Sequence, residues 1–218
     1  MRMAPFLATF LGAMSLTASL AAAEAGFSIG WGDHCWSDAG ATNDLTWACN
    51  SDNYAGVRMT LSFKSPYTRG DFAGVALYME GQTEAHDRIP DWWRMESDGC
   101  RPWESHLAVS ADASAIAGGM GDCVDVWQGT SASGGGAIGS YTTTIFGEHS
   151  YFNAIYAVWP RLWVAAGAEY FAFQIRFSTA RTVGGECVGC DLPFVWSVES
   201  VELGFDNVTT STYLTRTY

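Results

Sequence analysis

Two adjacent tryptophans lie between two charged residues in the run formed by Asp91, Trp92, Trp93 and Arg94. On an extended strand, neighbouring side chains point to opposite faces. One indole can therefore fill the core while the other faces outward. An outward indole beside a carboxylate and a guanidinium is typical of a sugar-binding platform, because the apolar face of a pyranose ring stacks on it. These four residues form the predicted binding site. The alternative is that both indoles are buried under the following loop.

Acidic residues are the other groups whose chemistry would suit catalysis. The chain holds 23 Asp and Glu residues against 11 Lys and Arg, and four of the acids surround one predicted loop: Glu80, Glu84, Asp87 and Asp91. A glycosidase needs two carboxyl groups about 5–10 Å apart. A secreted polysaccharide-active hydrolase that uses paired carboxylates is therefore the alternative function. Because spacing singles out no pair of acids, no catalytic residue is assigned.

Sequence motifs of other chemistries are absent. The chain has no G-x-S-x-G, no G-x-x-x-x-G-K-[ST] and no H-E-x-x-H. The histidines share no metal-ligand spacing, and no metal site is assigned to them: His34, His86, His106 and His149. Glu148 and His149 would point to opposite faces of a strand. A formal net charge of −12 without a basic stripe also argues against a nucleic-acid partner.

Residues 33–53 are rich in oxygen ligands. The acids and amides of this turn-rich stretch are Asp33, Asp38, Asn43, Asp44, Asn50, Asp52 and Asn53. Carboxylate and amide oxygens suit Ca²⁺ in an exported module. The same residue types also build turns, and their spacing here is not diagnostic of a cation site. Calcium is therefore a candidate cofactor, with turn formation as the alternative.

The cysteine count is even: Cys35, Cys49, Cys100, Cys123, Cys187 and Cys190. In an exported chain an even count indicates disulfides, although six cysteines allow many pairings. Short loops favour consecutive pairing, as Cys35–Cys49, Cys100–Cys123 and Cys187–Cys190. The last pair forms a C-x-x-C motif in a predicted loop between strands. A structural bridge there is favoured over a redox motif, which normally opens a helix, and over half of a zinc site.

The N-terminus is typical of an export signal. Arg2 precedes an uncharged stretch over residues 4–20, and Ala21-Ala22-Ala23 supplies the small residues that a signal peptidase requires. The alternative, a membrane anchor, is disfavoured because the stretch is rich in Ala, Ser and Thr. Residues 1–23 are therefore predicted to be cleaved. The mature chain, residues 24–218, is expected to be secreted or periplasmic, without membrane insertion.

The dominant hydrophobic period is two residues, which indicates half-buried strands. The clearest strands are predicted over residues 57–64, 72–80, 170–177 and 201–205, and weaker ones over 27–31, 45–49, 105–109, 123–127, 138–146 and 194–199. Residues 152–165 are ambiguous between strands and a short helix, because Pro160 forbids a continuous helix. Residues 112–117 are expected to form a helical turn. Short strands joined by Gly, Ser and Asp turns predict a single-domain antiparallel β-sandwich or jelly roll over residues 24–218.

Several short motifs in order resemble a group of uncharacterised exported bacterial proteins. They are Trp31-Gly32-Asp33-His34-Cys35, then Ile89-Pro90-Asp91-Trp92-Trp93, then Cys100-Arg101, then Cys187-Val188-Gly189-Cys190. In that group the motifs read W-x-D-x-C, L-P-x-W-W, C-R and C-x-G-C. This chain has Ile89 in place of the Leu, and it lacks a further cysteine expected shortly after C-x-G-C. The resemblance implies export and a β-rich fold, and it transfers no catalytic residue.

These observations favour a non-catalytic exported β-sandwich with a surface, structural or binding role. The predicted partner is a glycan or another surface protein. The hydrolase is the alternative, and a thiol oxidoreductase acting through Cys187 and Cys190 is the weakest candidate.

Overall fold

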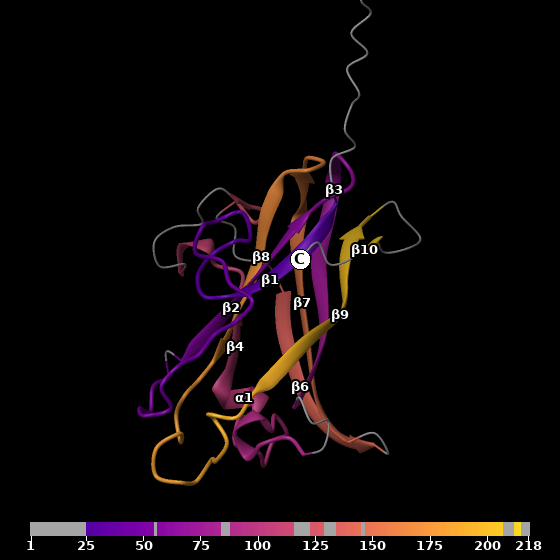
Figure 1. Ribbon diagram of the computed structural model, residues 1–218. Coiled ribbons are helices and arrows are strands. Elements are labelled where there is room, and N and C mark those ends of the chain that lie inside the picture. The colour runs from indigo at the N-terminus through magenta and orange to yellow at the C-terminus, as the bar shows by residue number, and fades with distance from the viewer. Residues whose placement is uncertain are drawn as a thin grey trace, which may run out of the picture.

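The computed structural model describes residues 25–54, 56–83, 88–115, 123–128, 134–144, 147–206 and 212–214. Two sheets pack face to face as a β-sandwich (Figure 1), so the predicted all-β fold is confirmed. The helical elements of the described chain are short: α1 (Trp103–His106) and the 3-10 turns η1 (Asp91–Trp93) and η2 (Ala113–Ala115). The predicted signal segment, residues 1–23, lies outside the described residues, as does the end of the expected helical turn over 112–117.

The first sheet has the strand order β1-β2-β8-β4, with β5 beside β8. Its strands are β1 (Gly26–Trp31), β2 (Val57–Lys64), β8 (Glu169–Phe177), β4 (Leu107–Ser110) and β5 (Val124–Asp125). All pairs are antiparallel except β5 with β8. Met59, Leu61 and Phe63 point into the core, as the alternation in β2 predicts. The intervening Thr60 and Ser62 are also buried, because the long connection from β1 to β2 covers this outer face.

The second sheet has the order β10-β9-β3-β7-β6. Its strands are β10 (Thr212–Leu214), β9 (Phe194–Phe205), β3 (Arg69–Thr83), β7 (Gly147–Val164) and β6 (Gly134–Thr144). The ambiguous residues 152–165 thus belong almost entirely to one strand, β7. Pro160 is accommodated where the register between β3 and β7 shifts, at a point where the ladder does not need its missing N–H.

Three of the weaker strand predictions need correction. Residues 45–49 form no strand, because Trp47 turns onto the core and Cys49 forms a crosslink instead of extending a sheet. The strand expected over 105–109 begins only at Leu107, after α1. The strand expected over 123–127 is reduced to the two residues of β5. The large side chains in these segments pack on an existing sheet, so their alternation does not require a new strand.

The disulfides join segments that are far apart in the sequence. They are Cys35–Cys123, Cys49–Cys190 and Cys100–Cys187, with sequence separations of 87 to 141. The consecutive pairing expected from short loops is therefore wrong, and so is a bridge inside the C-x-x-C motif. Loop length favours near neighbours only in an unfolded chain, whereas the sandwich brings distant loops together. No cysteine is free, which indicates an oxidising environment outside the cytoplasm.

Both sheets bury aromatic side chains in one shared core. Phe63 and Phe72 stack with their ring centroids 5.6 Å apart, and they join β2 of the first sheet to β3 of the second. Trp127 reaches the same region and donates its indole N–H to the carbonyl of Ala172 at 2.6 Å. Among the described residues, no helix is long and apolar enough to cross a bilayer.

We predict that replacing Cys49 and Cys190 together by Ser lowers the free energy of unfolding by about 2–5 kcal/mol, because this crosslink closes the longest loop. Urea denaturation followed by tryptophan fluorescence measures the change. Ser140→Ala, at an exposed position, serves as the substitution control. An unchanged unfolding midpoint, or non-reduced peptide maps that show other cysteine pairs, would contradict the assigned connectivity.

Candidate functional site

The residues expected to form a sugar-binding platform do not lie on a strand. Asp91–Trp93 form the 3-10 turn η1, which follows Pro90. Successive side chains of such a turn lie about 120° apart, so neighbours need not face opposite sides as they do on a strand. Trp92 is 0% exposed and Trp93 is 2% exposed. The alternative, that both indoles are buried, is therefore confirmed, and the expectation that one of them faces outward is wrong.

Trp92 is held in place by a buried arginine. The Cζ atom of Arg101 lies 4.0 Å from the centre of the Trp92 ring. The indole N–H of Trp92 donates to Thr182 Oγ1 at 2.9 Å, and Arg101 donates to the same oxygen at 3.1 Å. Burial lowers the pKa of Arg101 to about 10, so the guanidinium remains charged at neutral pH. The C-R motif thus supplies a structural contact to Trp92.

Asp91 and Arg94 stay at the surface and interact with charged neighbours. The Asp91 carboxylate lies 3.6 Å from Arg88 and 3.9 Å from Arg94. Arg94 also pairs with Glu96 at 2.6 Å. Both partly exposed groups therefore already have charged partners, and neither adjoins an open indole face. A binding role for the set predicted from the sequence remains a prediction.

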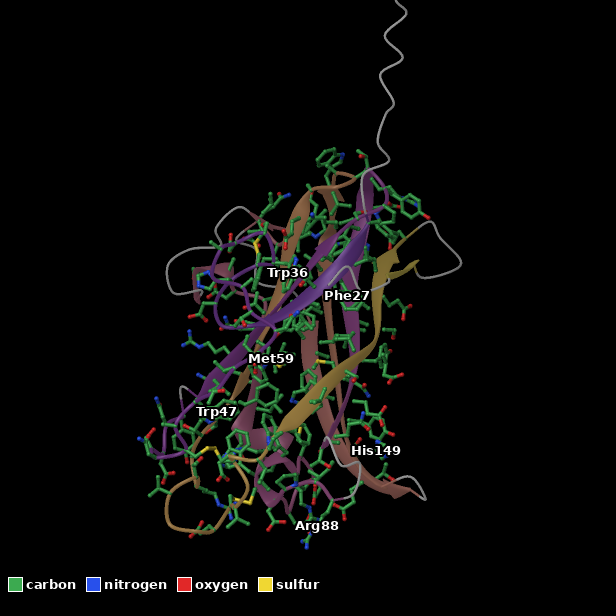
Figure 2. The ribbon with its side chains drawn as sticks, in the orientation of Figure 1. Phe27, Trp36, Trp47, Met59, Arg88 and His149 are labelled. Carbon is green, nitrogen blue, oxygen red and sulfur yellow. A yellow bond between two sulfur atoms is a disulfide. The ribbon has the colours of Figure 1, made fainter. Side chains whose placement is uncertain are left out.

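A cavity lies between β1 and the beginning of β9. This aromatic cleft has a volume of about 520 Å³, and its rings come from Trp31, Trp47, Trp93, Phe194 and Trp196. Figure 2 shows Trp47 and Met59, two of its lining residues, on the side of the sandwich where β1 and β9 lie. Of the four residues predicted to form a sugar-binding platform, Trp93 alone lines this cleft.

Ring contacts keep the wall of the aromatic cleft together. Trp93 stacks on Phe194 with centroids 4.5 Å apart and an interplanar angle of 8°. Trp47 meets the edge of Trp93 at 6.0 Å, and Trp31 lies 6.1 Å from Trp47. The rings therefore come from β1, from η1, from β9 and from the connection between β1 and β2.

Three indole N–H groups of this wall have no acceptor. The Nε1 atoms of Trp47, Trp93 and Trp196 are buried without a hydrogen-bond partner among the described residues. Trp92 and Trp127, by contrast, donate to Thr182 and Ala172. A buried donor without a partner costs about 1–3 kcal/mol. All three of these indoles belong to side chains that line the aromatic cleft.

Two loops form the polar rim of the aromatic cleft. One contributes Asn43, Asp44 and Thr46, and the other contributes Asp191. Both carboxylates are on exposed residues, and no Lys, Arg or His lines the cavity. The disulfide Cys49–Cys190 joins these two loops directly. The rim is therefore acidic and is crosslinked across its two sides.

The acids expected as calcium ligands are dispersed among different partners. Asp38 accepts the backbone N–H of Cys35 at 3.1 Å, and Asp33 binds Arg58 at 3.0 Å. Asp44 lies at the cleft rim, while Asp52 accepts the N–H of Val183 at 2.9 Å. No three His, Cys, Asp or Glu side chains gather into a metal site within the described part of the chain.

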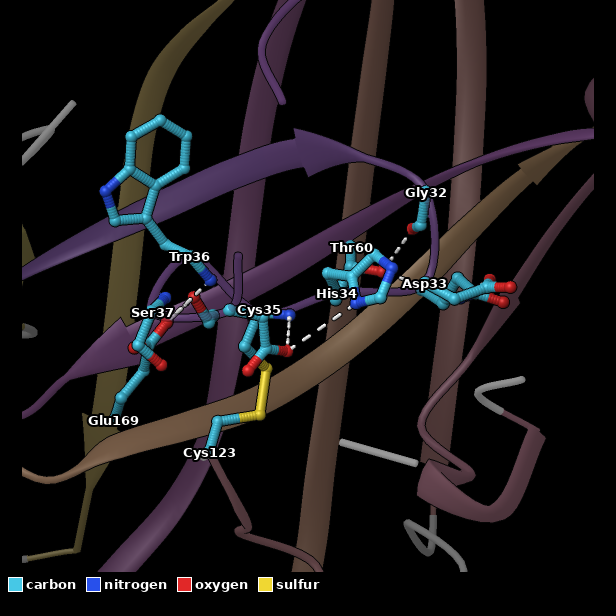
Figure 3. A network of polar contacts seen from close by, with 12 residues as sticks. Gly32, Asp33, His34, Cys35, Trp36, Ser37, Thr60, Cys123 and Glu169 are labelled. Carbon is cyan, nitrogen blue, oxygen red and sulfur yellow. Dashed lines mark hydrogen bonds and ion pairs between the residues drawn. A yellow bond between two sulfur atoms is a disulfide. The ribbon is translucent and has the colours of Figure 1, made fainter. Parts of the chain in front are cut away.

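The carboxylate of Glu169 in β8 holds the connection after β1 against the first sheet. The Glu169 carboxylate accepts the backbone N–H groups of Trp36 at 2.9 Å and Ser37 at 3.2 Å (Figure 3). It also accepts the hydroxyl of Ser62 at 2.5 Å. Glu169 is thereby engaged in holding the loop, and its oxygens are already occupied by protein donors.

One pair of carboxyl groups does come together, on the outer face of the second sheet. Glu80 of β3 contacts the imidazole of His149, and the hydroxyl of Tyr151 lies 3.5 Å from Glu80. A hydrogen bond with Glu80 raises the pKa of Glu199, and burial adds to this shift. Carboxyl groups that interact this directly lie closer together than the about 5–10 Å at which a glycosidase holds its pair. Glu84, Asp87 and His86 lie outside the described residues.

Sequence reasoning missed most of the aromatic cleft, because its residues are scattered over five segments. Only the excess of ten tryptophans pointed toward it. No family model matches the chain, and comparisons with curated proteins and with solved structures likewise find no match.

We predict that Trp92→Ala lowers the free energy of unfolding by about 3–5 kcal/mol, because it empties a fully buried site and removes the ring that covers Arg101. Trp159→Ala is the matched control, since Trp159 is 71% exposed and should cost less than about 1 kcal/mol. Chemical denaturation measures both variants. Equal losses would contradict the burial assigned to Trp92.

We also predict a pH-dependent effect of Glu199→Gln. The raised pKa means that the folded protein holds the Glu199 proton more tightly than the unfolded chain does. This contribution to stability is complete at low pH and is lost as the pH rises through the raised pKa. The Gln variant, which cannot ionise, should therefore melt higher than the wild type at neutral pH, with a smaller difference in acid. Thermal melts across the pH range test this, and a pH-independent difference would refute it.

Proposed function

We propose that this protein is a non-catalytic exported β-sandwich module that binds a glycan in the aromatic cleft. The observation that supports this proposal is the set of three indole N–H groups without acceptors around one cavity of about 520 Å³. A cavity of this size accommodates a small ligand or the end of a chain. The mixture of ring faces and unsatisfied donors matches a ligand that is apolar on its faces and rich in oxygen at its edges.

A pyranose has this combination of surfaces. Its C–H face packs on aromatic rings, and its hydroxyl oxygens accept hydrogen bonds from groups such as indole N–H. Asn43, Asp44 and Thr46 at the rim supply side chains that exchange hydrogen bonds with further hydroxyls. A ligand oxygen that reaches Trp47 or Trp196 would remove part of the cost of leaving these donors unpaired.

Export is part of the same proposal. The three disulfides fit an oxidising compartment, and residues 1–23 have the features of a cleavable signal. A secreted or periplasmic location would expose the protein to cell-surface polysaccharides. The proposed partner is therefore a glycan of the envelope or of the surroundings.

We predict that Trp47→Ala weakens glycan retention by a factor of about 10 or more, as is usual for a tryptophan at the centre of a binding site. Affinity electrophoresis in gels containing cellulose derivatives, xylan, pectin or chitosan measures retention. Trp159→Ala, on the outer face of the second sheet, is the matched control. Trp47→Phe keeps most of the packing but removes the N–H, so it separates loss of a ligand contact from loss of folding.

The same samples distinguish binding from turnover. Retention that depends on Trp47, without release of reducing ends, supports the proposal. Retention that is unaffected by both Trp47 variants would place the ligand elsewhere. Release of reducing ends that is abolished by Glu80→Gln or Glu199→Gln would favour the hydrolase instead.

A further inference from the structure

We infer that the aromatic cleft selects glycans with free ammonium groups, such as polymers of glucosamine, over neutral and acidic glycans. This inference rests on the proposed function and specifies its ligand class. It starts from Asp44 and Asp191, the two acids that line the cleft. Both are exposed, one on each of the two rim loops.

The carboxylates of Asp44 and Asp191 differ from most acids nearby in having no cationic partner. Within the described part of the chain, neither forms an ion pair, and neither carboxylate accepts a hydrogen bond from a side chain or the backbone. Asp33 and Asp91, in contrast, are paired with Arg58 and with Arg88. The negative charge at the rim is therefore available to a ligand.

The remaining lining reinforces a preference for positive charge. No basic side chain lines the aromatic cleft, so nothing in its wall neutralises the two acids. Indole rings attract cations through the electron density of their faces, and tryptophan is the strongest of the aromatic residues in this respect. An ammonium group near Trp47 or Trp196 would thus meet both a ring and a carboxylate. An anionic sugar would meet repulsion from the same carboxylates.

Long-range charge acts in the same direction. The chain has 23 acidic against 11 basic residues and a formal net charge of −12. Such a field concentrates cationic ligands near the surface and repels anionic ones, and salt weakens both effects. The local acids then determine where a cationic ligand binds.

The disulfide Cys49–Cys190 joins the two loops that carry the rim acids. Cys190 is the immediate neighbour of Asp191, and Cys49 lies in the same loop as Asp44 and Trp47. The crosslink therefore limits how far the two acidic loops can separate. Holding the binding groups in place before the ligand arrives reduces the entropic cost of binding.

An amino sugar satisfies all three features of the cleft. Its ring face packs on the indoles, its oxygens accept from the unpaired N–H groups, and its ammonium group pairs with a rim carboxylate. A neutral glycan uses only the first two of these features. A simple quaternary ammonium ion uses the rings and the acids, but it has no oxygen for Trp47, Trp93 or Trp196.

The test compares glucosamine oligomers with N-acetylglucosamine oligomers of the same length by isothermal titration calorimetry. Low ionic strength and mildly acidic pH keep the amines charged and the screening weak. We expect the glucosamine oligomer to bind about tenfold more tightly, because each ammonium adds a charge-assisted hydrogen bond. Asp44→Asn combined with Asp191→Asn should abolish this preference while leaving the weaker neutral binding. Asp98→Asn combined with Glu186→Gln, two exposed acids outside the cleft, is the control for net charge because it removes the same number of charges.

Each outcome separates the inference from the proposed function. Equal binding of the two oligomers, or a preference that survives the double variant, overturns the inference and leaves glycan binding intact. Binding of neither oligomer, with tight binding of a neutral or acidic glycan elsewhere in the panel, also overturns it. Failure of every glycan overturns the proposed function as well. Tetramethylammonium that binds as tightly as the glucosamine oligomer would show that the cleft recognises the cation without the sugar.

Discussion

The stacking of Trp93 on Phe194 is the contact on which the end of the sandwich that holds η1 and the beginning of β9 depends. It joins η1 to the beginning of β9, and the edge of Trp93 also meets Phe177 of the first sheet at 5.8 Å. A single buried indole therefore connects both sheets and the segment between them. Because its remaining side forms part of the aromatic cleft, the packing that closes the core also shapes the candidate binding site.

Outside the aromatic core, carboxylates and hydroxyl groups hold the connection after β1 against the first sheet. Glu169 and Asp33 bind the connection after β1 to the first sheet, so the hydroxyls of Ser62 and Thr60 are buried with partners. The disulfide Cys35–Cys123 anchors the same connection at a second point. This arrangement allows a long loop without strands to act as a third layer, and it positions Asp44 and Trp47 at the cleft.

Much of the fold was predictable from residue alternation. The strands over residues 57–64, 72–80 and 170–177 were expected, because two-residue alternation places large apolar groups on one face. The segment 45–49 shows the same alternation without forming a strand. Its Trp47 and Cys49 satisfy their packing through an indole cluster and a crosslink, which a local pattern does not distinguish from a sheet.

The sequence by itself determined the class of fold, the oxidising environment and an unusual wealth of tryptophan, since these follow from composition, cysteine count and short-range periodicity. Tertiary structure alone decided which cysteines pair, that Trp92 and Trp93 are both buried, and that Asp44 and Asp191 share a cleft. The physical reason is that these relations join segments far apart in the chain. They depend on how the two sheets are connected and packed, and the local sequence around each residue does not specify that arrangement.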